Sequence, residues 1–154
     1  MTLFLSGSKL LSDFNSWDLV DGCCGELFVN TPFAFEKAIE WSSRINEYEK
    51  RASFSMMAML AVHDKKADDK KFELFFPVII KASDDNRNFV RKAVNWALRQ
   101  IGKRNLKLCN KAIMLGKVIY EKGDSSSQWI SSDALKELEK YKSQGRIKSI
   151  GNAR

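Results

Sequence analysis

A repeat with a step of 41 residues runs through the middle of the chain. The segment KRASFSMMAML, from Lys50, aligns with RKAVNWALRQI, from Arg91, so that basic and apolar positions share one register. The same step carries Ala93 to Ala134, within SDALKEL. A period near 40 residues with two helices in each unit is typical of HEAT and armadillo-like repeats. We therefore predict an all-α protein built as a HEAT/armadillo-like helical repeat stack; an irregular helical bundle is the competing interpretation.

Helical periodicity dominates the rest of the chain as well. A helix should start at Thr31-Pro32, Pro77 should kink or split a helix that starts near Asp68, and Gly102 and Gly123 should stop the helices before them. Residues 1–141 are expected to form one repeat domain, and residues 142–154 a polar, disordered tail. The other expected helices span residues 2–13, 16–29, 47–62, 86–101, 105–122 and 126–141.

The composition argues against several classes of protein. No apolar stretch approaches the roughly 20 residues that span a bilayer, and the first residues do not read as a signal peptide, so we expect a cytoplasmic protein. Three cysteines and one histidine do not suit a disulfide framework or a structural zinc site. No glycine-rich phosphate loop, nucleophile elbow or metal-ligand pair appears. We therefore expect neither a metal nor a cofactor.

Positive charge is concentrated in one part of the chain. The net charge is +7, yet residues 1–50 contain four Lys/Arg against eight Asp/Glu. Residues 87–122 contain ten Lys/Arg and a single acid, Glu121. A block this basic is typical of proteins that bind a polyanion, most often nucleic acid. The same pattern also fits a solvated helix face, and charge alone does not choose between the two.

Four residues have both a structural and a functional interpretation. Trp17 and Asp21 are four residues apart and so share one helical face, where half-buried packing alone would explain them. Arg51 lies within an apolar helix, where a guanidinium either pairs with an acid or contacts a phosphate. Trp96 lies among small and aliphatic residues of a basic amphipathic helix, and taken alone it fits the core.

Several segments resemble those of the AlkD-type DNA alkylation repair glycosylases. They are SWDLVDGCCGELF, KAIEWSSRINEYEKRASF, LAVHDKKA, NFVRKAVNWALRQIGKRNLKL and WISSDALKEL, in collinear order over about residues 12–140. The resemblance implies a monomeric, cofactor-free HEAT-like stack that clasps duplex DNA and excises N3- or N7-alkylated purines. In the family, further helices precede the W-x-x-x-D helix. This chain has room for at most one short helix there, so we expect it to lack the family's N-terminal helices.

The resemblance also implies roles for individual residues. Asp21 would stabilise the sugar cation that develops as the base leaves, while Trp17 and Trp96 would pack on the deoxyribose. Arg51 resembles the family's phosphate-contacting arginine. Together with the basic block, the expected DNA contacts are Arg51, Arg91, Lys92, Arg99, Lys103, Arg104, Lys107 and Lys111.

The sequence is also compatible with two other functions. One is a HEAT-like module that binds nucleic acid without catalysis, and the other is a protein–protein scaffold. The joint presence of Trp17, Asp21, Arg51 and Trp96 argues against the scaffold. The expected lack of N-terminal helices keeps the binding-only module open. The expected partner is duplex DNA that contains alkylated bases, with no membrane, in the cytoplasm at the nucleoid or in a eukaryotic nucleus.

Overall fold

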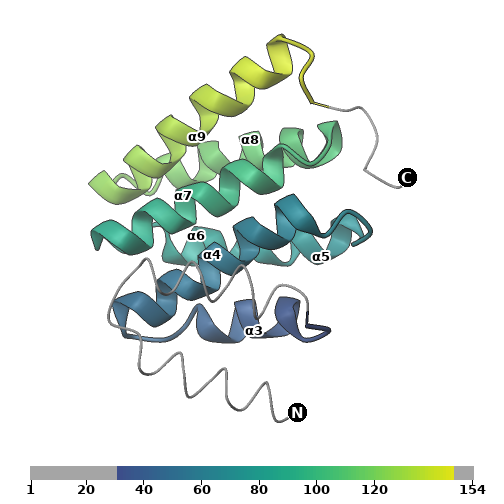
Figure 1. Ribbon diagram of the computed structural model, residues 1–154. Coiled ribbons are helices and arrows are strands. Elements are labelled where there is room, and N and C mark those ends of the chain that lie inside the picture. The colour runs from purple at the N-terminus through teal and green to yellow at the C-terminus, as the bar shows by residue number, and fades with distance from the viewer. Residues whose placement is uncertain (1–30, 148–154) are drawn as a thin grey trace.

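The computed structural model describes residues 31–147, and within that range the chain is all-helical, with no strand. The predicted all-α helical repeat fold is confirmed (Figure 1). The elements are α3 (Ala34–Trp41), α4 (Glu47–His63), α5 (Asp69–Glu73), α6 (Phe75–Ala82), α7 (Asn88–Gly102), α8 (Leu106–Tyr120) and α9 (Ser125–Ser143). The helices expected at 2–13 and 16–29 lie outside the described residues, as do Trp17 and Asp21.

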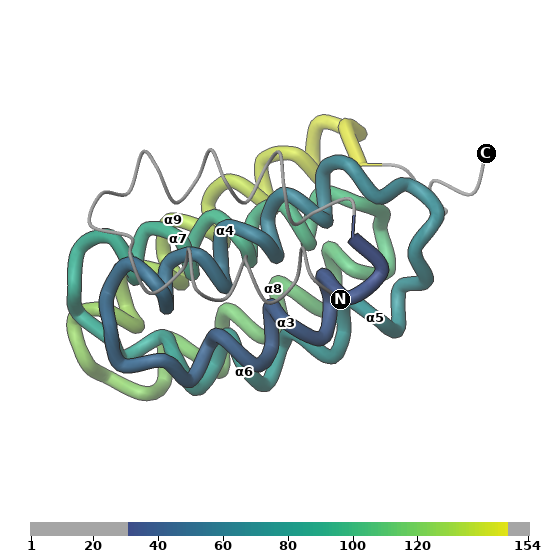
Figure 2. The backbone as a smooth tube through the Cα atoms, turned by 60° about the horizontal axis from the view of Figure 1, so that its bottom comes forward, coloured from purple at the N-terminus to yellow at the C-terminus, as the bar shows by residue number. Residues whose placement is uncertain are grey.

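The helices form two layers, as Figure 2 shows. One layer contains α4, α7 and α9, in which α7 lies between its two neighbours. The other contains α3, α6 and α8, with the short α5 leading into α6. Successive pairs, α3 with α4, α6 with α7 and α8 with α9, therefore stack side by side. The 41-residue step of the sequence corresponds to this stacking, since α4 begins at Glu47 and α7 at Asn88.

Hydrogen bonds between residues 41 to 44 positions apart tie each helix pair to the pair before it. Arg87 Nη1 donates to the carbonyl of Ile45 at 2.6 Å, and Ser126 Oγ donates to the carbonyl of Asp85 at 3.0 Å. The Asp85 carboxylate also accepts from Lys50 Nζ at 2.9 Å. The hydrogen bond from Arg87 is the main reason that the pKa of Asp85 lies well below its usual range. Hydrogen bonds thus join the loop before α7 to the helix pair before it and to the helix pair after it.

A common apolar core fills the space between the two layers. Its largest fully buried side chains include Trp41 of α3, Phe54 of α4, Phe72 of α5 and Leu98 of α7. Large side chains from four elements share one core, so the stack forms a single packed unit. This packing fixes the outward-facing side of α7, on which the candidate site depends.

Gly102 does not stop α7 in the way the sequence suggests. Within the described residues, positive φ angles occur at Gly123 (86°) and Gly145 (66°) only. A Cβ at Gly102 would lie 2.7 Å from a methyl carbon of Leu138 and 3.1 Å from the Ala112 Cβ. Glycine is therefore needed at 102 for the close approach of α8 and α9 to α7, whereas Gly123 ends α8 as expected.

Three other boundaries differ from the sequence-based expectation. The helix expected at Thr31-Pro32 begins at Ala34, after a turn. The predicted split near Pro77 occurs at Leu74, which places the proline in the first turn of α6, where no backbone N–H is required. The helix expected at 126–141 runs from Ser125 to Ser143, and Ile147 packs against the core. Residues 148–154 lie outside the described residues.

Candidate functional site

Trp96 lies on the outward side of α7 rather than inside the core. Its side chain is partly exposed, whereas Trp41 is completely buried. Residues 92, 96, 99 and 103 recur every three or four positions, which places them along one side of the helix. We call Lys92, Trp96, Arg99 and Lys103 the α7 stripe. Three of its four members are cations, so Trp96 lies in a row of basic residues along the helix.

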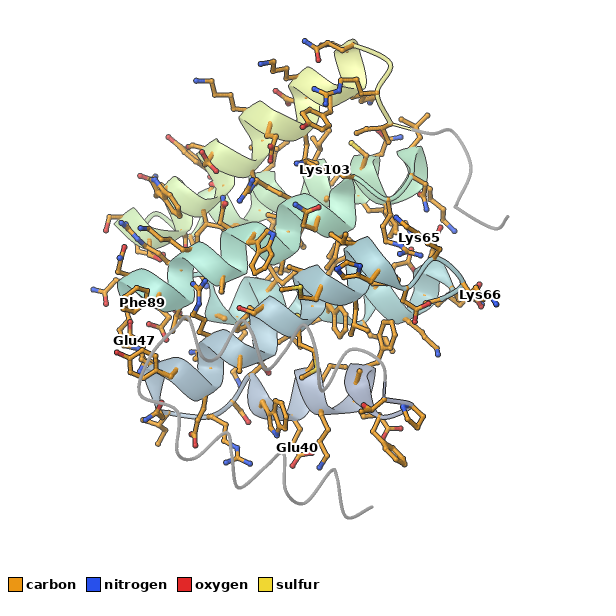
Figure 3. All side chains as sticks on the ribbon, in the orientation of Figure 1. Glu40, Glu47, Lys65, Lys66, Phe89 and Lys103 are labelled. Carbon is orange, nitrogen blue, oxygen red and sulfur yellow. The ribbon has the colours of Figure 1, made fainter. Side chains whose placement is uncertain are left out.

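The α7 stripe meets α9 through a shared carboxylate. Lys103 Nζ lies 3.0 Å from Glu137 Oε1, and Arg99 Nη1 lies 3.0 Å from Glu137 Oε2. Arg99 Nε also donates to Asn95 Oδ1 at 2.7 Å and lies 3.9 Å from an Asp133 oxygen. Lys103, at the end of α7, can be located in Figure 3. Two cations of α7 therefore converge on one acid of α9.

The ionisation of Glu137 reflects these neighbours. Partial burial of its carboxyl raises the pKa, but the hydrogen bonds from Lys103 and Arg99 outweigh burial and hold the pKa below its ordinary value. Lys103 Nζ also lies 4.5 Å from the ring centroid of Tyr141, one helical turn beyond Glu137. The carboxylate is thus charged at neutral pH, and it offsets part of the positive charge of the α7 stripe.

A second tryptophan on the same layer stacks on a predicted DNA contact. The guanidinium carbon of Arg91 lies 4.7 Å from the ring centroid of Trp129, which is 37% exposed. Arg91 Nε is buried and has no hydrogen-bond partner among the described residues. The neighbouring Lys92 is exposed, and within residues 31–147 it forms no salt bridge. Lys92 is therefore available to an external anion.

Arg104 is a structural residue, contrary to the expectation that it contacts DNA. Its side chain is only 5% exposed, and its guanidinium donates to the carbonyls of Ala61 at 3.0 Å, Asp64 at 2.7 Å and Ala67 at 3.1 Å. The guanidinium carbon also lies 4.0 Å from the ring centroid of Phe72. Because these donors already satisfy carbonyls at the end of α4 and in the loop after it, Arg104 cannot reach a phosphate at the surface.

Lys107 and Lys111 are exposed, but they lie on a different side of the molecule from Trp96. Both belong to α8, in the α3–α6–α8 layer, and the buried side of α8 packs against α7 and α9. Lys111 Nζ pairs with Glu73 of α5. The two lysines therefore belong to the other layer than the α7 stripe.

Arg51 connects α4 to α7. It is 8% exposed, and its Nη1 donates to the carbonyl of Phe89 at 2.8 Å. At the same end of these helices the Glu47 carboxylate accepts a hydrogen bond from the backbone N–H of Phe89 at 3.3 Å, and Figure 3 shows the two residues side by side. The remaining predicted site residues, Trp17 and Asp21, lie outside the described residues, so their relation to Arg51 stays a prediction.

Three residues of α9 that contact the cations of α7 were not identified from the sequence: Trp129, Asp133 and Glu137. The 41-residue step that relates Ala93 to Ala134 also carries Lys92 to Asp133 and Trp96 to Glu137. The sequence thus contained a signal for these acids, because equivalent positions of stacked repeats lie on the same face.

Neither a metal-binding cluster nor a helix that could span a membrane occurs among the described residues. No cluster of histidine, cysteine and acidic side chains there has the arrangement that holds a metal ion. No described helix is long and apolar enough to cross a membrane.

The family of the chain follows from comparison with known proteins. A family model described as DNA alkylation repair enzyme matches residues 4–138. The chain belongs to this family. Comparisons with curated proteins and with solved structures gave no match. Membership of the DNA alkylation repair family supports a role in DNA repair and implies an interaction with DNA.

Proposed function

We propose that the protein binds duplex DNA over the exposed side of the α4–α7–α9 layer and excises positively charged N3- or N7-alkylated purines. The family match over residues 4–138 carries this proposal. The α7 stripe supports it, because a partly exposed tryptophan among cations suits a sugar–phosphate ligand better than it suits a sealed core.

Cleavage of the glycosidic bond of an alkylated purine requires few catalytic groups. An N3- or N7-alkylated purine already carries positive charge, so it leaves as a neutral base without a general acid. The sugar becomes cationic as the bond breaks, as in other glycosidic cleavages. In this proposal the carboxylate of Asp21 stabilises that cation and positions the attacking water. The rings of Trp17 and Trp96 pack on the deoxyribose, where their electron-rich faces favour the developing charge.

Affinity comes from contacts with the DNA backbone. Lys92, Arg99 and Lys103 form a row along α7 that can follow successive phosphates, and Arg91 stands beside them at Trp129. Arg51 donates to the Phe89 carbonyl and is 8% exposed, so in this proposal its guanidinium would have to turn outward to hold a phosphate. Contacts of this kind position the protein on the duplex without reading base sequence. The protein would therefore recognise the lesion through the backbone and the sugar.

The decisive experiment measures base release. Methylated duplex DNA is incubated with the protein, and free 7-methylguanine and 3-methyladenine are quantified. Asp21→Asn keeps the shape of the side chain but removes the charge that opposes the sugar cation, so the rate should fall on the order of a hundredfold or more. Asp18→Asn removes the same charge three positions earlier and serves as the control, with a rate close to that of the wild type.

Other outcomes separate this proposal from its alternatives. A folded wild type that binds duplex DNA but releases no base would replace the enzyme with a binding-only module. Equal losses in the Asp18→Asn and Asp21→Asn variants would show that net charge, and not a placed carboxylate, controls the rate.

A further inference from the structure

The contact between α7 and α9 contains an anion-binding geometry that a protein carboxylate already fills. Arg99 Nη1 and Lys103 Nζ each lie 3.0 Å from a different oxygen of Glu137. The two cations are one helical turn apart and approach the two oxygens of one planar anion from the same side of α7. A phosphodiester offers the same feature, two charged oxygens on one centre, to a guanidinium and an ammonium.

The three side chains remain accessible to solvent. Their exposed fractions are 26% for Arg99, 19% for Lys103 and 26% for Glu137. Because the ion pairs are partly open to solvent, an external anion can reach the two cations and compete with the carboxylate. Lys103 also contacts Tyr141, and Arg99 is held by Asn95, so both cations stay in place when the carboxylate leaves.

We propose that Arg99 and Lys103 form a phosphodiester-binding site on α7 in which Glu137 occupies the position of the phosphate until DNA displaces it. This inference rests on the proposed function, since it assumes that DNA binds over the α7 stripe. In this arrangement Glu137 competes with DNA for the two cations. Glu137 lowers the affinity for any duplex and so limits the time that the protein spends on undamaged DNA.

A single substitution at Glu137 should strengthen the binding of duplex DNA. Glu137→Gln keeps an oxygen that accepts a hydrogen bond from Arg99 or Lys103, so the α7–α9 contact should persist, but it frees one positive charge. The phosphate then binds Arg99 and Lys103 without having to displace a carboxylate, so affinity should rise roughly tenfold near 0.1 M salt, and the dependence of log affinity on log salt should steepen by up to about 0.9. Binding is measured by fluorescence anisotropy with a short unmodified DNA duplex over a series of salt concentrations.

Glu139→Gln is the matched control. It removes the same charge from an exposed position on the same helix, and Glu139 forms no salt bridge within the described residues. Its gain in affinity should be much smaller, because a charge outside the α7–α9 contact is screened over about 10 Å at 0.1 M salt. Thermal unfolding of both variants verifies that the stack is intact.

The outcomes are distinct. Tighter binding and a steeper salt slope for Glu137→Gln alone would support the site. Equal gains in the two variants would show a general charge effect and overturn it. Weaker binding by a folded Glu137→Gln variant, or no binding by any variant at low salt, would also overturn it. If Glu137→Gln binds more tightly while the wild type releases no alkylated base, the phosphate site stands and the proposed excision activity fails.

Discussion

The helices α7 and α8 are consecutive in the chain and both strongly basic, yet they expose their charge on different sides of the molecule. On α7 the cations Lys92, Arg99 and Lys103 lie along the same side of the helix as the partly exposed Trp96. On α8 the exposed cations include Lys107 and Lys111, and the apolar side chains beside them are Met114, 68% exposed, and Val118, 54% exposed. A single basic block in the sequence therefore becomes two separate surfaces.

The contrast between α7 and α8 shows that a high density of charge along the sequence does not locate a binding surface. In a stack of helix pairs, successive helices alternate between the two layers, so cations that are close in the chain become distant in space. Cations that share a face are related by helical spacing within one element and by the repeat step between elements. By that criterion Lys103 belongs with Trp96, whereas Lys107 does not.

The largest effect is expected from a comparison of tryptophans in the two layers. Trp41 of α3 is fully buried, so Trp41→Ala should leave a cavity and lower the free energy of unfolding by about 3–5 kcal/mol. Trp96 is partly exposed, so Trp96→Ala should cost well below that range and instead reduce excision of alkylated purines. Urea unfolding and base-release assays on both variants provide the measurements. A Trp96→Ala variant as unstable as Trp41→Ala would place Trp96 in the core and remove it from the site.

A smaller effect separates two adjacent cations at the end of α7. Arg104→Ala leaves three carbonyl groups without their donor, and it should lower the free energy of unfolding by about 3 kcal/mol. Lys103→Ala removes a partly exposed ion pair with Glu137 and should cost about 1 kcal/mol. Duplex binding should weaken for Lys103→Ala, while Arg104→Ala should affect it only through loss of folded protein. Arg104→Ala with unchanged stability and weakened binding would return Arg104 to the DNA surface.

Much of the fold could be predicted from the sequence, because periodicity and repeat step are local properties. The 41-residue step identified α4 and α7 as equivalent helices, and Gly123 was correctly expected to end α8. Gly102 was misread, because its role depends on Leu138 and Ala112, which approach it only in the folded stack. No local pattern distinguishes a glycine needed for conformation from one needed for close packing.

The candidate site was less predictable, because it depends on which neighbours each cation meets. Arg104 looks like its neighbour Lys103 in the sequence, yet one side chain is buried against backbone carbonyls and the other reaches a carboxylate at the surface. The partner of Lys103 is 34 residues away on α9, and burial of Arg104 arises from the loop after α4. The family resemblance supplied Trp96, but the separation of the cations into two surfaces required the structure.

The most direct test compares the salt dependence of duplex binding for two double variants. Lys92→Gln with Lys103→Gln removes two charges from the α7 stripe, and Lys107→Gln with Lys111→Gln removes two charges from α8. If DNA lies over Trp96, the first variant should lose about 0.9 in salt slope for each lost contact, roughly 2 in all, and the second should keep the slope of the wild type. A flattened slope in the α8 variant, with the α7 variant unchanged, would place the DNA on the opposite layer and contradict the proposed site.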